Sequence, residues 1–586
     1  MTEDPLASQS LFELLRSCKM GEAGAIVGGH IDRNELRQEL YVPTEVDDVV
    51  NSFFVSNYQR DGHFLIITGS AGDGKSALLS RGFKNAKEHG IDSVSEDNVH
   101  MDATAATRKT ESYASTLGRF LETASENLHR GVGPRSGLAI NLGLAIDFFE
   151  RKGNDEDFPE IWSAIESTRT KLLHEKENIT VLNLGFRSIY SIHPESLGEG
   201  ILGSLVDKFN ASGPDSPFHQ AYLRSKSSCP AGKDCPLLYN VSQLEDDQLR
   251  ASLTELFAAK GIIDNEYLNP RRIIHHLASI LLPSELEHTS ATHDTCPIGK
   301  SVNYGREVSP EYLIWNSIFD ELKSGGSPSK GMLDPAAYAS KDLDLRVIEL
   351  GANPKLLDDK TGELPHVNNG AIDDQIRTLL RKSYLSKDGK FDLRTAIDWT
   401  WFREEFLSSY AYLANNGEQD SHSRNALQQG ARDVNRTLHD SLKGWTGSPI
   451  EGDYIEYIDG IKTPEYRFLA KWTSPEIDEE RSRQRTREES MPGQMWFVLK
   501  PNTADDTIPI PLTFNLYVLM HRIAQGYSPN ARDIERSEGM RLIQSRLSEF
   551  TEKQKRTRVI NKAGEQLFSL ERGGFGAIDV RGGDSL

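Results

Sequence analysis

The segment from Gly69 to Ser76 reads GSAGDGKS and constrains the fold of this 586-residue chain more than any other stretch. It fits the pattern G-x-x-x-x-G-K-[ST] without a mismatch, and the apolar run HFLIITGS leads into it. A short apolar run that ends in glycine is typical of a buried parallel strand, and the amphipathic stretch that follows is typical of a helix. This order predicts a phosphate-binding loop, and the alternative is a glycine-rich turn with an exposed lysine.

Each residue type in this motif has a chemical role in holding a triphosphate. The glycines let the backbone curl so that successive N–H groups face phosphate oxygens, and the following helix adds its positive end. Lys75 can reach the β- and γ-phosphates, and the Ser76 hydroxyl suits a Mg²⁺ ligand. No guanine-specific motif is evident, so ATP is the expected nucleotide. The predicted nucleotide-binding residues are Gly69, Ser70, Ala71, Gly72, Asp73, Gly74, Lys75 and Ser76.

Strands and helices alternate after this point, which predicts an α/β fold with a P-loop NTPase core and a parallel sheet. Further strands are expected at NVHMDATA, at the start of GLAINLGLAIDFFERKG and at NITVLNLGF. Later amphipathic stretches predict a helical lid and a mostly helical C-terminal region. The expected divisions are 1–60, an N-terminal helical region; 61–215, the P-loop NTPase core; 216–300, a helical lid-like region; 301–475, a mostly helical middle region; 476–494, a charged linker or solvated helix; and 495–586, a C-terminal region.

Hydrolysis of ATP also requires an acid that holds the metal's water shell and polarises the attacking water. Asp102 ends the strand VHMD, where it can point at the nucleotide, although a helix N-cap or turn residue is an equally good interpretation. Asn141 ends the next strand, where its amide could sense the γ-phosphate or orient water; a turn residue bonded to local backbone is the alternative. Because no hhhhDE segment is present, hydrolysis is either slow or uses an acid from another segment or subunit.

Arginines beyond the predicted sheet are candidates for residues that stabilise the transition state of hydrolysis. Arg271 and Arg272 open an amphipathic helix in NPRRII, and an arginine at such a place can reach back to the phosphates. A fixed cation there stabilises the charge on a transferring phosphoryl group. At least one of the two is expected to be merely solvated. Arg187, after the strand NITVLNLGF, is a weaker candidate of the same kind.

Cysteine and histidine spacing gives only a weak indication of zinc. Cys229 and Cys235 are separated by five residues, which is wider than the usual C-x₂₋₄-C of structural zinc sites. Cys296, with His293 and His288 nearby, could supply further ligands. Two ordinary thiols near a turn are the favoured interpretation.

The charge and hydropathy of the chain indicate which partners and compartments to expect. The chain has 67 Lys and Arg against 87 Asp and Glu, a net charge of −20, which argues against a protein that coats DNA. Arg541 to Lys562 holds seven Lys and Arg with two Glu and could touch nucleic acid, although a solvated helix face is favoured. The N-terminal stretch lacks the apolar run of a secretory signal, and no run approaches a membrane span. A cytoplasmic protein is expected.

Several stretches together resemble DptF, the ATPase subunit of bacterial restriction systems that depend on DNA phosphorothioation. They are GSAGDGKSALLSR, VHMDATAA, LAINLGLAIDFF, CPLLYN, NPRRIIHHLASILL and PLTFNLYVLMHRIAQGYSPNARDIERSEG. The order of DAT, INLG, NPRR and GYSPNARD is more specific than the loop alone, and no segment between about 300 and 490 takes part. INLG departs from a conventional acidic motif, which leaves the hydrolytic acid in doubt.

The resemblance implies an ATPase that works with DptG- and DptH-like subunits against DNA that lacks the sulfur modification. It implies that the phosphate-binding positions fall on Gly69 to Ser76. DNA is then contacted mainly through the partners, and no nuclease signature is evident in this chain. The alternatives are a nucleotide-gated assembly scaffold and an AAA- or STAND-like regulator, each with little hydrolysis of its own.

Overall fold

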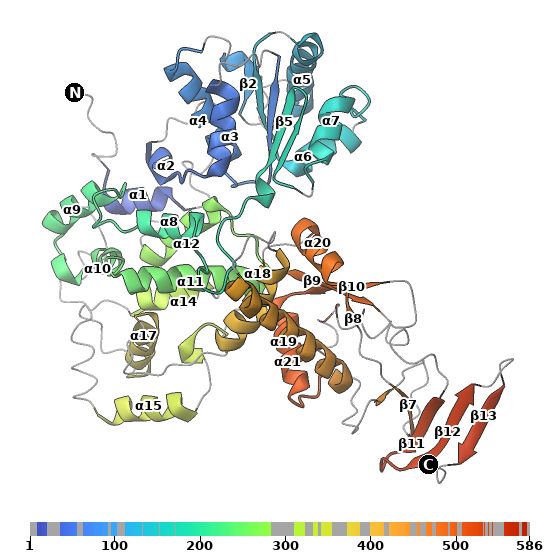
Figure 1. The fold of residues 1–586 in the computed structure, drawn as a ribbon. Helices are drawn as coiled ribbons and strands as arrows, with labels where there is room; N and C mark the ends of the chain where they lie inside the picture. Colours follow the sequence, from blue (N-terminus) through green and yellow to red (C-terminus); the bar gives the residue numbers. More distant parts are fainter. Residues whose placement is uncertain are drawn as a thin grey trace. The chain divides into compact units, whose positions relative to one another are not determined.

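The chain divides into two units, which are described separately (Figure 1). Unit 1 comprises residues 1–191, 197–258 and 268–396, and unit 2 comprises 192–196, 259–267 and 397–586. The computed structural model describes residues 9–19, 35–55, 62–91, 95–101, 112–131, 133–151, 153–169, 171–282, 310–322, 332–337, 341–353, 372–386, 399–414, 421–445, 454–456, 465–471, 476–489, 493–500, 507–530, 532–533, 537, 539, 542, 556–572 and 577–582.

Unit 1 contains a five-stranded mixed sheet in the order β2-β3-β1-β5-β4. The first four strands in this order run parallel, and β4 pairs antiparallel with β5 at one edge. The prediction of an α/β fold is therefore confirmed, with a sheet of mostly parallel strands. The strands are β1 (Phe64–Thr68), β2 (Val99–His100), β3 (Ser136–Ala139), β4 (Leu173–Lys176) and β5 (Ile179–Asn183).

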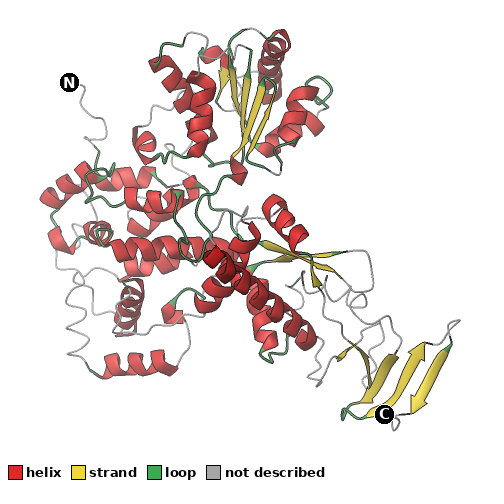
Figure 2. Ribbon diagram, in the orientation of Figure 1, coloured by secondary structure: helices red, strands yellow, loops and turns green. Residues whose placement is uncertain are grey.

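Helices cover both faces of this sheet (Figure 2). Residues of β1 alternate between the two layers: Phe64 and Ile66 pack under one set of helices, and Leu65 and Ile67 pack under the other. The Phe64 face is covered by α5 (Tyr113–Arg130), α6 (Leu142–Ile146), the π-helical turn η4 (Asp147–Arg151) and α7 (Pro159–Glu166), and the Leu65 face by α3 (Glu45–Val55) and α4 (Lys75–Glu88).

Helix α3 belongs to the sheet layer, although the sequence placed it in a separate region before residue 60. It buries Val50, Phe53 and Phe54 against α4 and the strands. The buried guanidinium of Arg135 donates to the carbonyls of Phe53 and Phe54 at 2.9 and 2.7 Å, so it satisfies the last turn of α3. Close packing of α3 on α4 is possible because Gly82 has no side chain at the contact.

Further helices of unit 1 lie before and after the sheet in sequence. Among them α12 starts with an Asn269 side chain that accepts from the Arg272 amide, followed by Pro270 at the first helical position. The helices are α1 (Leu11–Ser17), α2 (Glu35–Leu40), α8 (Ile201–Lys208), α9 (His219–Ser228), α10 (Pro236–Gln243), α11 (Asp247–Asp264, which continues into unit 2), α12 (Pro270–Leu281), α14 (Ile314–Leu322), α15 (Lys341–Ala352) and α17 (Ile372–Leu385).

The sequence predicted a mostly helical C-terminal region, and unit 2 contains, beside its helices, two antiparallel sheets that were not predicted (Figure 2). Their strand orders are β10-β9-β8 and β13-β12-β11-β7-β6. The strands are β6 (Tyr454–Glu456), β7 (Tyr466–Lys471), β8 (Glu476–Ile477), β9 (Met495–Lys500), β10 (Ile508–Leu512), β11 (Arg556–Asn561), β12 (Gln566–Arg572) and β13 (Ile578–Gly582). The helices of unit 2 are the π-helical η11 (Trp401–Leu407), α18 (Ser408–Ala414), α19 (Ser421–Trp445), α20 (Glu479–Glu489) and α21 (Phe514–Ala524).

Of the two interpretations of segment 476–494, a linker or a solvated helix, the structure has a helix, whereas the basic stretch 541–562 differs from its favoured interpretation. Segment 476–494 contains α20, and the hydroxyls of Ser482 and Thr486 accept from the amides of Val498 and Trp496, both at 2.9 Å. This polar helix is therefore bonded to β9 rather than left as a linker. The basic stretch Arg541 to Lys562 ends in strand β11 and not in a solvated helix face, while most of its earlier residues lie outside the described part.

Among the helices that the structure describes, none has both the length and the apolar character needed to cross a bilayer.

Replacing Gly82 with Ala should destabilise unit 1. The new Cβ would overlap Val50 and lie 2.9 Å from a ring carbon of Phe54, and overpacking of this kind costs about 1–3 kcal/mol. Gly118→Ala in α5 is the matched control, because no atom lies within 4 Å of its added Cβ. A helical Gly→Ala change in open space should stabilise by about 0.5–1 kcal/mol. Urea unfolding followed by circular dichroism measures both changes, and equal stabilities would contradict the packing of α3 on α4.

Candidate functional site

The segment Gly69–Ser76, which we call the glycine-rich loop, joins the carboxyl end of β1 to the start of α4. Gly72 and Gly74 have φ angles of +95° and +91°, a region that other residues rarely adopt. Gly74 is the N-cap of α4, so the first amides of a fourteen-residue helix point toward the loop. The first amides of a helix and its dipole favour an anionic ligand at this point.

Asp73 holds the loop together from inside. Its side chain is fully buried, and its Oδ2 accepts from the Ser70 amide at 2.5 Å. The same oxygen would lie 2.6 Å from a Cβ at Gly69, so only glycine fits there. The sequence grouped Asp73 with the nucleotide-binding residues, and in the structure its carboxylate binds the backbone of the loop.

Lys75 and Ser76 also bond to backbone carbonyls in this structure. The Lys75 ammonium donates to the Ser70 carbonyl at 2.6 Å, and the Ser76 hydroxyl donates to the Met101 carbonyl at 2.7 Å. The second bond brings the end of β2 against the start of α4. Asp102, the residue directly after Met101, lies outside the described residues.

Asn141 lies beside the loop at the end of β3. The amide of Leu142 donates to the Gly69 carbonyl at 3.1 Å, which fixes the start of α6 against the loop. Asn141 occupies the N-cap position of α6, yet its side chain makes no capping hydrogen bond. Its side chain lines the cavity described below.

Two arginines from other elements reach the same place. The buried Arg187 guanidinium donates to the Asp73 carbonyl at 2.6 Å. Arg271 lies at the start of α12. A Cβ added at Gly72 would lie only 3.1 Å from the Cβ of Arg271, so the arginine begins close to the loop. Both arginines line the cavity, whereas Arg272 does not; its backbone amide donates to Asn269. The structure thus separates the neighbouring arginines that the sequence offered as a pair.

Asn269 ties α12 to the loop, and the sequence analysis did not single it out as a functional residue. Its Nδ2 donates to the Ala71 carbonyl at 3.0 Å while its Oδ1 accepts from Arg272. An asparagine directly before Pro270 is a recognisable helix-start signal, so the sequence could have identified Asn269 as the cap of α12. Its bond to the Ala71 carbonyl joins residues distant in sequence and gives no such signal.

A cavity of about 450 Å³ lies over the loop, within unit 1. This volume lies in the range of sites that enclose small organic ligands. Four cations and one acid are among its lining residues, so the field inside it attracts anions. Its polar lining includes the loop from Ala71 to Ser76, Asn141, Arg187, Arg271 and Arg37; its apolar lining includes Leu36, Leu40, Val42, Ile201, Leu205 and Ile274. A ligand with a polyanionic end and an apolar end fits this division.

Cys229 and Cys235 do not line this cavity. Cys229 ends α9 and Cys235 is the N-cap of α10, and neither forms a disulfide. Within the described residues no group of three or more His, Cys, Asp or Glu side chains is arranged to hold a metal ion. Cys296, His293 and His288 lie outside the described residues.

Comparisons of the chain with protein families, with curated proteins and with solved structures gave no match in any of the three. The function is therefore argued from the geometry of the cavity.

Changing Asn269 to Asp should loosen the loop without removing the helix cap. An aspartate still accepts from the Arg272 amide, but it cannot donate to the Ala71 carbonyl. We expect faster amide hydrogen exchange in the glycine-rich loop and unchanged exchange in the first turn of α12, measured by mass spectrometry. Asn269→Ala, which removes both bonds and costs about 1 kcal/mol, should speed exchange in both. If the loop of the Asn269→Asp variant exchanges its amide hydrogens at the wild-type rate, the hydrogen bond from Asn269 to Ala71 does not hold the loop.

Proposed function

We propose that unit 1 is a P-loop NTPase core and that its cavity binds ATP with Mg²⁺ and hydrolyses the γ-phosphate. The observation that carries this proposal is the meeting of the glycine-rich loop, the start of α4 and two arginines of distant sequence origin in one cavity. Backbone amides, a lysine and fixed guanidinium groups are the donors that polyphosphate recognition uses.

The loop residues would hold the β- and γ-phosphates. Lys75 would exchange the Ser70 carbonyl for phosphate oxygens, and Ser76 would exchange the Met101 carbonyl for the metal. Lys75 now bonds to a carbonyl of the loop and Ser76 to a carbonyl at the end of β2. Ser76 is the residue that would hold Mg²⁺, which would reduce the negative charge of the phosphates when bound.

Hydrolysis would proceed by in-line attack of water on the γ-phosphorus. A new P–O bond to water forms as the bond to the bridging oxygen breaks, and ADP leaves with that oxygen. Arg271 and Arg187 would stabilise charge on the transferring group, and Asn141 would orient the water. Asp102 is our candidate for the acid, because it directly follows the Met101 carbonyl that Ser76 contacts.

We further propose that this ATPase serves a bacterial restriction complex that depends on DNA phosphorothioation. Support for this part comes from the resemblance of the motif order to DptF. DptG- and DptH-like subunits would then be its partners, and its closure on ATP would signal to them. The net charge of −20 supports a division of labour in which the partners make the main contacts with DNA. Such a complex would act in the cytoplasm.

A nucleotide-gated scaffold, or an AAA- or STAND-like regulator, is the second candidate. One observation favours it: Asp73 is the one acid among the described residues that line the cavity, and its carboxylate binds the Ser70 amide. A chain without a hydrolytic acid would bind ATP, assemble and turn over slowly. Assembly that requires nucleotide but tolerates Asp102→Ala, with negligible phosphate release in the presence of DNA and partners, would favour this candidate over the ATPase.

Lys75→Ala should abolish the activity. Loss of the ammonium removes a preorganised charge at the transferring phosphate, so we expect phosphate release to fall at least about 100-fold and ATP binding to weaken. Lys84→Ala is the matched control, since it is an exposed lysine on the same helix that does not line the cavity. Phosphate release and restriction of phage in cells are the measurements. Wild-type levels of both in Lys75→Ala would refute the mechanism.

Arg271→Ala and Arg272→Ala should differ although the residues are adjacent. Only Arg271 lines the cavity, so its loss should lower kcat about 10²–10³-fold. Arg272 contributes its backbone amide to the helix cap, which an alanine keeps, so hydrolysis by that variant should stay near wild type. Single-turnover hydrolysis at saturating ATP compares them, and equal losses would exclude a specific role for Arg271.

A further inference from the structure

We propose that the apolar end of the cavity recognises the base of the nucleotide and selects adenine over guanine. This inference rests on the proposed function, because it names the ligand of the same cavity. Two sets of residues carry it: an aliphatic wall, and the segment that joins α2 to α3 without being helix or strand. The segment comprises residues 41–44, and we call it the 41–44 segment.

The aliphatic wall comes from three helices that are distant in sequence. Leu40 of α2, Leu205 of α8 and Ile274 of α12 all line the cavity. Leu205 and Leu40 are almost fully buried, while Ile274 is half-buried at the cavity surface. Purine rings gain free energy when their faces leave water for aliphatic side chains. The phosphates would lie at the glycine-rich loop, so the wall is the part of the lining that suits a base.

The 41–44 segment offers a peptide edge beside this wall. Val42 lines the cavity outside any helix or strand, and within the described residues its N–H and C=O have no hydrogen-bond partner. One peptide supplies one donor and one acceptor. Adenine presents the complementary pair, with the 6-amino group as donor and N1 as acceptor. Pro43, which follows, has no N–H and restricts the chain to this course.

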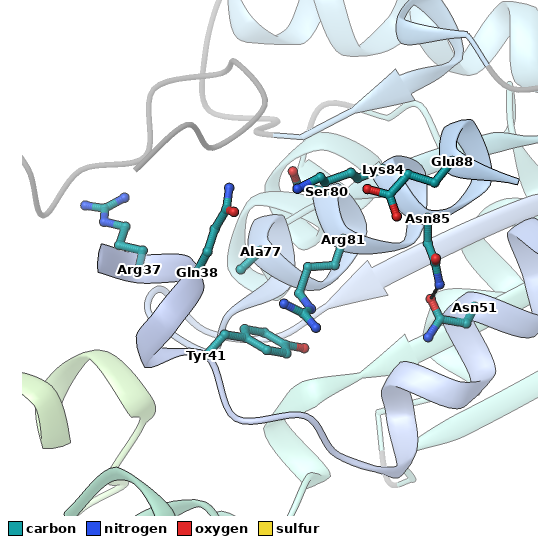
Figure 3. Close-up of a pocket in the computed structure, with 10 residues that line it drawn as sticks. All are labelled: Arg37, Gln38, Tyr41, Asn51, Ala77, Ser80, Arg81, Lys84, Asn85 and Glu88. Carbon is teal, nitrogen blue, oxygen red and sulfur yellow. Dashed lines mark hydrogen bonds between the residues drawn. The ribbon is translucent and has the colours of Figure 1, made fainter. Parts of the chain in front are cut away.

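The segment is held in place by α3, through Asp47, and by α4, through Arg81 (Figure 3). The Arg81 guanidinium of α4 lies 4.4 Å from the centre of the Tyr41 ring. The Tyr41 hydroxyl donates to Asp47 at 2.8 Å, and the Thr44 amide donates to the same carboxylate at 2.8 Å. Burial, with the Asp47 charge beside it, raises the pKa of the Tyr41 hydroxyl, so it stays protonated and continues to donate. The base contacts are thus positioned by α3 and α4 together, and α4 also begins at the phosphate-binding loop, which lowers the entropy cost of binding.

Guanine presents the inverted pair at the same positions, because its O6 accepts and its N1–H donates, so in the pose that suits adenine each would face a like group of Val42. Its N1–H and 2-amino groups are two adjacent donors that need acceptors, and a carboxylate would satisfy both. Asp73 is the one carboxylate among the described lining residues, and it accepts from Ser70 inside the loop. Enclosing guanine would leave donors without partners, and an unsatisfied buried polar group is a strong source of discrimination.

Binding of four probes to the full chain tests the proposal: ATP, GTP, inosine triphosphate and inorganic tripolyphosphate, each with Mg²⁺, by titration calorimetry. We expect ATP to bind at least about 10-fold more tightly than GTP and more tightly than inosine triphosphate, which lacks the 6-amino donor. Tripolyphosphate should bind as well, but more weakly than ATP. Equal affinities for ATP, GTP and inosine triphosphate would overturn base selection. Binding of tripolyphosphate alone would then still support the proposed function.

Leu205→Ala and Leu202→Ala form a matched pair on α8. Both side chains are almost fully buried, but only Leu205 lines the cavity. Leu205→Ala should weaken ATP about 10-fold and leave tripolyphosphate unchanged, whereas Leu202→Ala should change neither. If both leucine variants bind ATP alike, the wall does not contact the base.

Ile274→Ala repeats the test at a half-buried position, where truncation threatens folding less. The same pattern is expected, with ATP weakened and tripolyphosphate unchanged. Lys75→Ala separates the two proposals, because it should weaken both ligands. If Lys75→Ala binds tripolyphosphate as the wild type does, the proposed function fails rather than the base selection.

Discussion

The hydrogen bond between the buried Asp73 carboxylate and the Ser70 amide is the constraint on which the candidate site depends. It closes the glycine-rich loop on itself, and the loop then presents its carbonyls outward to fixed partners. Lys75 bonds to the carbonyl of Ser70, Asn269 to that of Ala71 and Arg187 to that of Asp73. These partners come from a helix start, a second helix start and a strand end. One small loop thereby determines where α12 and the end of β5 lie.

Local patterns predicted much of the site. The loop, its preceding strand and its following helix form one continuous stretch, so apolar runs, glycines and a helix start are all visible in a short window. The alternation of strands and helices then predicted the α/β fold, and Asn141 and Arg187 were recognisable as strand-end residues. They lie at the loop because carboxyl ends of parallel strands share one edge of a sheet.

Features that depend on distant pairing were not predictable in this way. Helix α3 precedes the first strand, and nothing local shows that Phe53 and Phe54 pack against the sheet. Strands β7 and β11 pair across a long stretch of sequence, and each is short, so neither gives a strong periodic signal. Helix α20 was ambiguous because it packs through the hydroxyls of Ser482 and Thr486 instead of an apolar face. In all three cases, α3, the β7–β11 pair and α20, the observed structure depends on contacts with residues distant in sequence.

The interleaving of the two units bears on how the protein is made. The cavity is complete in sequence once α12 has been synthesised, but 192–196 and 259–267 belong to unit 2. These stretches follow Arg187 and precede Asn269 closely, and the rest of unit 2 starts only at residue 397. During synthesis, roughly 10 s pass between the addition of these stretches and the addition of residue 397, where the rest of unit 2 begins. Neither unit is a continuous piece of chain, so neither can be expressed alone by simple truncation. During the interval before unit 2 is complete, a chaperone that binds these stretches would protect them from aggregation.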